Sequence, residues 1–257
     1  MSNTIPLSEA RKTQGFRSWF FYGPPGTGKT TAATLLPHKR KLVIDVDQKI
    51  STMDNLPPEV VAKVSVWTPN TPALSGPHIP IRRMDTKVGD KGYVPEDPQG
   101  YMRVVEFINS LIDQSKDFPY DLVILDSLSS LVEHMERLIL HHHKAATMSL
   151  PLWGIYAANL QELKGGLLSL PCDRILIAHS KIIQEELTSE VIVRPLVAGQ
   201  TADKLPKDFN EVYYFVGRSQ GKYRVRLHAD RKYVARTSKA VPGDEVTVDE
   251  MLAMFAS

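Results

Sequence analysis

The sequence predicts an α/β protein in which a mainly parallel sheet is covered by helices on both faces. Short apolar runs typical of buried strands alternate with stretches whose apolar residues recur at helical spacing. Polar residues directly follow several of these runs, as they do where parallel strands end at a binding edge. Beyond residue 180 the apolar period changes to two, which is typical of β-hairpins. These three observations predict a doubly covered sheet followed by a C-terminal β-hairpin region.

The bulk composition limits where such a protein works. A length of 257 residues with 42% hydrophobic content suits one domain with short appendages. The net charge of +2 confines any nucleic-acid surface to a local patch. Cys172 is the single cysteine, so no internal disulfide forms. Without a recognisable signal peptide or an 18-residue apolar run, we expect a soluble cytoplasmic protein with no membrane partner.

Expected elements follow in order along the first half of the chain. A polar strand or arm at 1–17 leads into the core, and Pro37 ends the first helix. The strands are expected at 19–22, 41–47 and 60–67, and the helix begins at 30. Residues 68–100 are rich in proline and glycine and lack apolar periodicity, so we expect a loop insertion there.

The second half continues the alternation before it changes character. Helices are expected at 101–112, 128–140 and 153–170, and buried strands at 121–126 and 174–179. Period-two stretches follow at 181–193, 211–216 and 222–234, with a short helix at 249–255. The predicted organisation is a core at 1–240, whose hairpin region is 205–240, and a C-terminal tail or short helix at 241–257.

A glycine-rich turn between the first strand and the first helix matches G-x-x-x-x-G-K-[ST], the phosphate-binding P-loop. Its glycines let backbone N–H groups surround a phosphate, and the helix N-terminus adds its positive dipole end. We expect Lys29 to reach the β- and γ-phosphates and Thr30 to hold Mg²⁺. The expected nucleotide-binding residues are Gly23, Pro24, Pro25, Gly26, Thr27, Gly28, Lys29, Thr30 and Thr31. The pattern predicts that the protein binds a nucleoside triphosphate, taken to be ATP, with Mg²⁺.

Polar side chains at the ends of three other strands are expected to converge on this loop. Asp126 ends an apolar strand, so we expect it to hold the metal opposite Thr30, although it could also cap the next helix. Asp47 is the best placed carboxylate to activate water, ahead of Asp45, although both could be capping or loop residues. His179 could sense the γ-phosphate or be merely structural.

Basic residues are concentrated near the C-terminus. Between 217 and 240 the only acid is Asp230. Strand alternation places Lys222, Arg224, Arg226 and His228 on one face while Tyr223, Val225 and Leu227 pack inward. Such a stripe could follow a nucleic-acid backbone, but it could equally be a solvated face. The three histidines at 141–143 could likewise contact phosphates weakly or lie on a solvated helix end.

The order GPPGTGKTT, LVIDVD, DLVILDSLSSL and RILIAHS resembles the core of RecA-like ATPases. The chain looks most like the small phage-encoded members associated with single-strand annealing and recombination, which share Trp153-Gly154 and Pro195-Leu196-x-x-Gly199. The resemblance spans about 15–235. It departs from the family where Asp47 replaces the usual Glu and His179 replaces the usual Gln, which puts fast hydrolysis and coupling to DNA in question.

The resemblance implies a Mg²⁺-dependent ATPase that acts on single-stranded DNA in recombination, annealing or repair. Its catalytic set is Lys29, Asp47, Asp126 and His179. It also implies a ring or filament of identical subunits, a single-strand binding protein as a partner, and Arg231 and Lys232 as cations that reach the neighbouring subunit's γ-phosphate. Two alternatives remain open, a ring-type loader or mechanical ATPase and a P-loop switch or small-molecule kinase without a DNA partner.

Overall fold

A nine-stranded sheet forms the centre of the molecule in this computed structural model, which describes residues 15–69, 99–114, 117–184, 190–199, 201–241 and 243–255. The strand order is β3-β2-β4-β5-β1-β7-β8-β9, and β6 pairs with β5 off this path. Every pairing from β3 to β7 is parallel, whereas β7–β8, β8–β9 and β5–β6 are antiparallel. The predicted fold class, a mainly parallel α/β sheet with a C-terminal hairpin, is confirmed.

The parallel strands are short and buried. They are β1 (Ser18–Gly23), β2 (Lys41–Asp45), β3 (Val64–Trp67), β4 (Leu122–Asp126) and the longer β5 (Asp173–Gln184). The antiparallel strands are β6 (Val191–Pro195), β8 (Lys222–Arg226) and β9 (Glu245–Thr247), and β7 (Glu211–Ser219) belongs to both parts. Strand β5 lies between β1 and β4, so the loops after β1, β4 and β5 open on the same edge.

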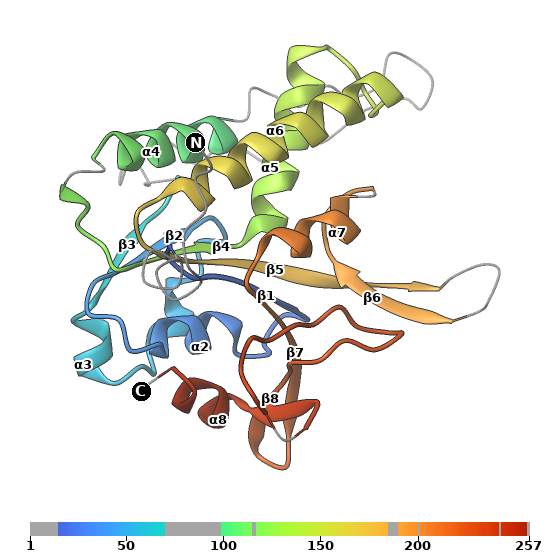
Figure 1. Cartoon of the computed structure of the whole chain (residues 1–257). Coiled ribbons are helices and arrows are strands. Elements are labelled where there is room, and N and C mark those ends of the chain that lie inside the picture. The colour runs from blue at the N-terminus through green and yellow to red at the C-terminus, as the bar shows by residue number, and fades with distance from the viewer. Residues whose placement is uncertain are drawn as a thin grey trace, which may run out of the picture.

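Helices cover both faces of the sheet (Figure 1). One face carries α4 (Gly100–Asp113), α5 (Leu128–His142) and α6 (Leu150–Ser169). The other carries α2 (Lys29–Leu35), α3 (Pro58–Val61) and α8 (Val248–Ala253). Shorter helical turns are η1 (Ile50–Met53), α7 (Thr201–Lys204) and η3 (Leu205–Asp208). No helix among these described segments combines the length and apolar character needed to cross a bilayer.

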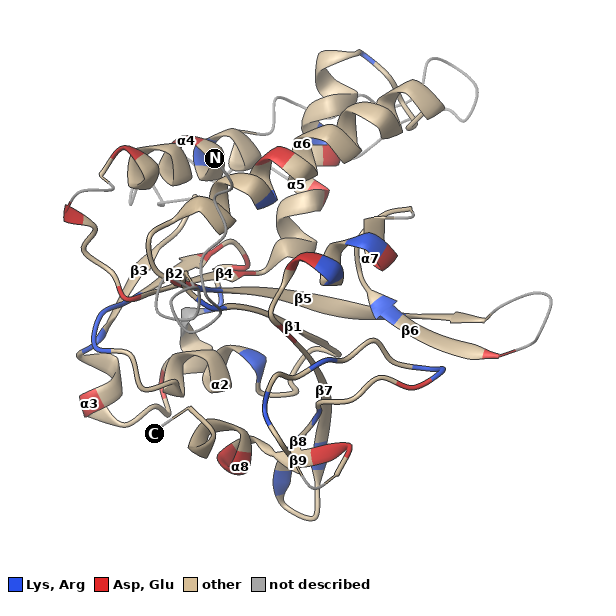
Figure 2. Cartoon of the chain, in the orientation of Figure 1, with Lys and Arg blue, Asp and Glu red and all other residues tan. Residues whose placement is uncertain are grey.

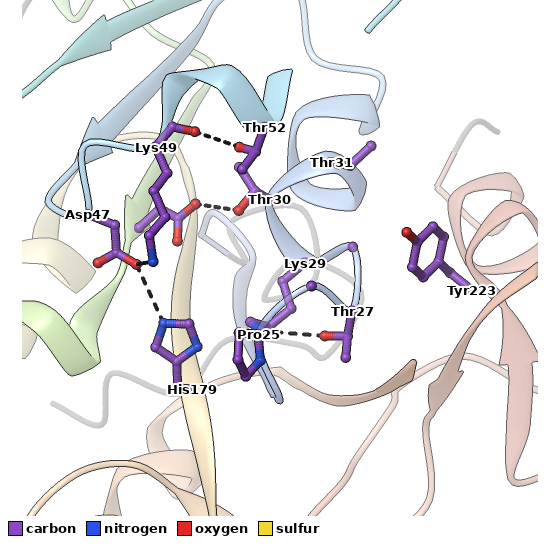
Figure 3. Close-up of a pocket in the computed structure, with 13 residues that line it drawn as sticks. Pro25, Thr27, Lys29, Thr30, Thr31, Asp47, Lys49, Thr52, His179 and Tyr223 are labelled. Atoms are coloured by element: carbon purple, nitrogen blue, oxygen red, sulfur yellow. Dashed lines mark hydrogen bonds and ion pairs between the residues drawn. The ribbon is translucent and has the colours of Figure 1, made fainter. Parts of the chain in front are cut away.

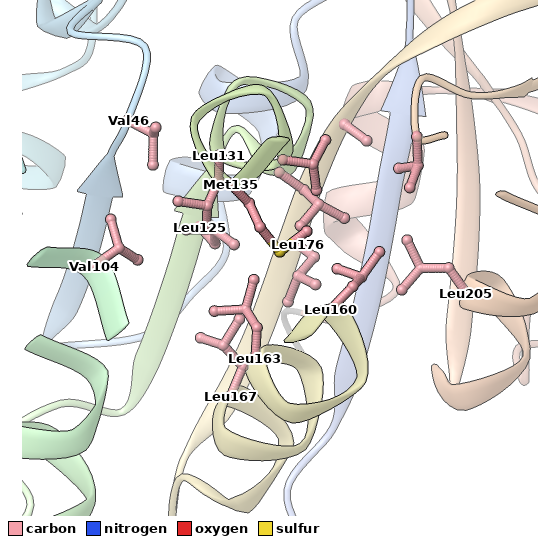
Figure 4. Packing of buried hydrophobic residues seen from close by; sticks show 14 of the residues in the cluster. Val46, Val104, Leu125, Leu131, Met135, Leu160, Leu163, Leu167, Leu176 and Leu205 are labelled. Carbon is pink, nitrogen blue, oxygen red and sulfur yellow. The ribbon is translucent and has the colours of Figure 1, made fainter. Parts of the chain in front are cut away.

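Each face of the sheet has its own hydrophobic core. Leu125 and Leu176 pack with Met135 and Leu160 of the α5–α6 layer (Figure 4). Their neighbours in sequence, such as Ile124, point to the other face and join the cluster that contains Met251 of α8. Because both faces are covered, each strand needs apolar residues at every position, which explains the continuous apolar runs in the sequence.

Two predicted parallel strands are longer in the sequence analysis than in the structure, and the period-two stretch expected at 222–234 forms a strand only over Lys222–Arg226. The strand expected at 60–67 begins only at Val64, because Pro58 starts a helical turn at 58–61. The strand expected at 41–47 ends at Asp45, because the backbone N–H groups of Val46 and Asp47 turn to the carbonyl of Asp126. The arm expected at 1–17 and the loop insertion expected at 68–100 lie mostly outside the described residues.

The C-terminal residues pack on the sheet. Strand β9 pairs with β8, and the Phe255 ring makes a T-shaped contact with the Trp19 ring at 5.5 Å between centroids. Thr247 and Glu250 form a capping box at the start of α8, which supplies the short helix expected at 249–255. The division of the chain at residue 240 stays a prediction.

Candidate functional site

The P-loop connects β1 to α2 in a conformation that requires glycine. Gly26 has φ 74° and Gly28 has φ 86°, both in the left-handed region. A Cβ atom at Gly23 would collide with the carbonyl oxygen of Phe215 on the adjacent strand β7. The glycines therefore let the loop turn tightly over the end of the sheet.

The Lys29 side chain is folded back onto this loop. Its Nζ donates hydrogen bonds to the carbonyl oxygens of Gly23 at 2.9 Å and Pro24 at 2.7 Å. Burial lowers the pKa of Lys29 to about 8, while the nearby carboxylates of Asp126 and Asp47 act in the opposite direction. The loop thus holds a cation at the position where a phosphate is expected.

Thr30 and Asp126 meet directly across the site. The Thr30 hydroxyl donates to Asp126 Oδ2 at 2.5 Å. Burial raises the pKa of Asp126 to about 6, and the charges of Asp47 and Asp45 add to this effect. The hydroxyl and the buried carboxylate offer two oxygen atoms side by side, among other acids, and oxygen ligands of this kind fit a Mg²⁺ ion. The cap of helix α5 is Ser127 rather than Asp126, and the peptide bond between these two residues is cis.

Asp47 is held by hydrogen bonds on the same side of the loop. The Ser127 hydroxyl donates to Asp47 Oδ1 at 2.9 Å, and His179 Nε2 lies 3.5 Å from Asp47 Oδ2 (Figure 3). Burial alone raises the pKa of Asp47, but hydrogen bonds from His179, Ser130 and Ser127 outweigh it and hold the pKa well below its usual range. Asp47 is therefore an ionised carboxylate facing the P-loop.

Asp45, the second candidate for the base, is placed differently. It pairs in register with Asp126 on the neighbouring strand and accepts a hydrogen bond from the backbone N–H of Lys49. Burial raises the pKa of Asp45, and its Oδ2 is buried without a hydrogen-bond partner. Unlike Asp47, it is absent from the cavity lining.

His179 lies on β5 directly opposite Gly23, the last residue of the neighbouring strand β1. Its backbone N–H donates to the Ser129 hydroxyl at 2.9 Å, which ties the middle of β5 to helix α5. Its Nδ1 is buried without a hydrogen-bond partner while Nε2 faces Asp47. The ring thus lies beside Asp47 in the lining of the P-loop cavity.

These residues line one cavity of about 340 Å³ at the carboxyl edge of the sheet. Its lining includes Lys49, Thr52 and Tyr223, which the sequence analysis does not assign to the site. Lys49 is signalled only by its position two residues after Asp47. Tyr223 is expected to pack inward, but 40% of its surface is exposed. The described lining is Pro25, Gly26, Thr27, Gly28, Lys29, Thr30, Thr31, Asp47, Lys49, Thr52, Asp126, His179 and Tyr223.

The predicted basic stripe on β8 is largely neutralised. Arg226 contacts Asp230 at 2.7 Å and Glu245 at 2.8 Å, and it also lies over the Tyr233 ring. Arg224 lies 3.5 Å from Glu245. Acidic and basic segments accordingly alternate around β8 and β9 in Figure 2. Lys222 is exposed at the start of the strand.

The other cations expected to act on partners lie away from the cavity. Arg231 is almost fully exposed and is 3.7 Å from Glu190, and Lys232 lies 5.2 Å from the Tyr233 ring centroid. Neither residue lines the P-loop cavity. The histidines at 141–143 lie at the C-terminal end of α5, on the face opposite α2.

Comparison with known proteins places the chain in a family. A family model described as "AAA domain" matches residues 16–240. The chain belongs to the AAA domain family. No curated protein sequence matches it. The matched segment of this AAA protein contains the P-loop, Asp47, Asp126 and His179, which identifies the chain as an AAA-type P-loop protein of the nucleotide-binding class.

Three solved structures are similar to this AAA protein at low identity. The ATPase of a type III secretion system of pathogenic bacteria is 12% identical with a TM-score of 0.44, over 78% of this chain and 52% of that one. The RadB recombinase is 18% identical with a TM-score of 0.45, over 82% and 79%. EscN of enteropathogenic E. coli, in complex with its central stalk EscO, is 11% identical with a TM-score of 0.45, over 78% and 42%. The chain thus spans about half of the first of these proteins.

Proposed function

We propose that this AAA protein hydrolyses ATP with Mg²⁺. The observation that carries the proposal is an ionised Asp47 facing the same cavity as Lys29 and the Thr30–Asp126 pair. Thr30 and Asp126 would hold the metal, which neutralises phosphate charge when bound. Lys29 would leave its carbonyl partners for the phosphates.

Asp47 is proposed to orient the attacking water. Its low pKa makes it a weak proton acceptor, which favours orientation over proton removal and is consistent with slow hydrolysis. His179, on the other oxygen of Asp47, is proposed to bind the γ-phosphate. A movement of His179 on loss of the γ-phosphate would then be transmitted to Ser129 and helix α5 through the hydrogen bond of the His179 backbone N–H.

We further propose that the protein binds single-stranded DNA and acts on it in recombination, annealing or repair. In this proposal the nucleotide is bound between identical subunits of a ring or filament. The exposed Lys222, Arg231 and Lys232 support this proposal. The ion pairs of Arg224 and Arg226 favour the alternative of a nucleotide switch without a DNA partner. Phage origin, a single-strand binding partner and a cytoplasmic location belong to the same proposal and rest on the sequence resemblance.

The test is phosphate release from ATP, with and without Mg²⁺ and with and without single-stranded DNA, beside a Lys29→Ala control. Mg²⁺-dependent release that DNA stimulates and the control lacks supports the whole proposal. Release that is indifferent to DNA supports the ATPase and rejects the DNA partner. Transfer of phosphate to an added acceptor instead of water would support a kinase.

A further inference from the structure

Tyr223 lines the P-loop cavity but has no role in the proposed phosphate and metal chemistry. Tyr223 comes from β8, in the antiparallel part of the sheet, and its ring packs beside the P-loop. A Cβ atom at Gly28 would lie 3.4 Å from atoms of the Tyr223 ring. The ring therefore stands close enough to the P-loop that a side chain at Gly28 would touch it, and it lines the same cavity as the loop.

The cavity has two chemically different ends (Figure 3). Asp47, Lys49 and His179 lie on one side of the P-loop, and Tyr223 lies on the other. In the proposed function, Lys29, Asp47 and the Thr30–Asp126 pair act on the terminal phosphates and their metal ion. A triphosphate that occupies the loop must therefore direct its sugar and base away from Asp47, toward the Tyr223 side.

Tyr223 is available for such a contact. It is 40% exposed although its neighbour Val225 is fully buried. The strand pairing places Tyr223 opposite Arg218, and within the described residues its hydroxyl makes no hydrogen bond. An aromatic ring that is half-exposed in a cavity offers a flat apolar surface to a planar ligand.

We propose that Tyr223 is the stacking platform for the base of the bound nucleoside triphosphate. The inference rests on the proposed function and extends it to the base-binding end of the site. Stacking is tolerant of base identity because every base has a π-face. Tyr223 thus adds affinity without strong selection between adenine and guanine.

The experiment measures equilibrium binding of ATP, GTP and inorganic tripolyphosphate, each with Mg²⁺. Tyr223→Ala is expected to weaken ATP and GTP about tenfold while tripolyphosphate, which has no base, changes less than about twofold. Tyr223→Phe is expected to bind all three ligands like the parent protein. Phe16→Ala, which removes an exposed aromatic ring at the opposite end of β1, is the matched control.

The outcomes separate this inference from the proposed function. An equal loss of ATP and tripolyphosphate binding in Tyr223→Ala would mean that the ring only supports the loop, and unchanged ATP binding would also overturn the inference. If Tyr223→Ala does not fold, Tyr223→Leu keeps an apolar side chain at this place in the cavity lining but removes the aromatic ring, and it serves the same test. A parent protein that binds tripolyphosphate and ATP equally well overturns the stacking role alone, whereas one that binds neither overturns both proposals.

Discussion

The two halves of the sheet use charge in opposite ways. In the parallel half, Asp47 lies 3.5 Å from both Lys49 and His179. Asp45 and Asp126 beside it make no ion pair within the described residues, and burial raises the pKa of both. In the antiparallel half, Arg224 and Arg226 each meet an acid within the fold. Charge that the fold leaves uncompensated is available to a ligand, whereas compensated charge mainly stabilises the fold. A ligand is therefore expected at the carboxyl edge of the parallel half of the sheet.

The largest expected effect tests the parallel half of the sheet. Asp47→Asn should lower the rate of phosphate release by roughly 10²- to 10⁴-fold, because the amide cannot take the place of the ionised carboxylate that orients water. ATP binding should persist, since Lys29 and Thr30 are unchanged. Steady-state release and direct nucleotide binding measure the two effects separately.

Asp45→Asn is the matched control for this prediction. The two carboxylates lie two residues apart, but Asp45 is absent from the cavity lining and accepts a hydrogen bond from the Lys49 backbone. Its loss should change phosphate release far less than the loss of Asp47. Equal rates in the two variants would contradict the assignment of water orientation to Asp47 rather than Asp45.

A second prediction concerns the stability cost of Asp126. Asp126→Asn should raise the free energy of unfolding of the nucleotide-free protein by about 2–3 kcal/mol above pH 6, because it removes a carboxylate whose pKa burial raises by roughly two units. The same variant should lose Mg²⁺-dependent phosphate release. Chemical denaturation and the release assay together measure this trade between stability and function.

The pH dependence gives the sign of the Asp126 effect. The folded protein holds the Asp126 proton up to about pH 6, whereas the unfolded chain loses it near pH 3.8. The contribution of this group to stability is therefore present below pH 3.8 and is lost as the pH rises to about 6. The gain in Asp126→Asn should shrink toward pH 4, and a gain that is constant with pH would contradict the buried-charge explanation.

A third and smaller effect tests the antiparallel half of the sheet. Glu245→Gln should lower the free energy of unfolding by roughly 1 kcal/mol, because it leaves Arg226 with one carboxylate partner instead of two. It also releases Arg224, so affinity for single-stranded DNA should rise a few-fold if the stripe binds DNA. Salt-dependent DNA binding measures this gain. A destabilised variant with unchanged DNA affinity would leave the stripe a structural feature only.

A modest change in phosphate release is expected at His179. His179→Gln should keep phosphate release within about threefold, because the amide N–H can still donate to Asp47. His179→Ala should lose about tenfold, since it removes that donor and the contact proposed for the γ-phosphate. Release rates of the two variants decide whether hydrogen bonding or the imidazole itself is required. Equal losses would assign the role to the imidazole.

The sequence predicts the parallel half well for a physical reason. Strands buried on both faces give continuous apolar runs, and the polar residue that ends each run must lie at the carboxyl edge. Asp126 and His179 are therefore located by local patterns alone. The turn after β2 is located less well, because its course depends on the carbonyl of Asp126, which is about 80 residues away.

The antiparallel half is predicted less well because alternation gives the face of a residue but not its partner. Of the two acids that pair with Arg226, Glu245 lies on a strand too short to give a clear sequence signal. Alternation also assigns Tyr223 to the buried face, although the P-loop beneath it leaves a cavity there. Both errors arise from contacts between segments far apart in the chain.

The folded-back Lys29 has a consequence for proton balance. With a pKa of about 8, about half of the Lys29 side chains carry the extra proton at pH 8 in the nucleotide-free protein. Phosphate anions favour the charged form, so nucleotide binding at this pH draws up to about half a proton from the buffer. The heat of binding should therefore vary with the ionisation enthalpy of the buffer at pH 8 and lose that dependence near pH 7. Proton uptake at pH 8 is therefore a direct measure of nucleotide binding at this site.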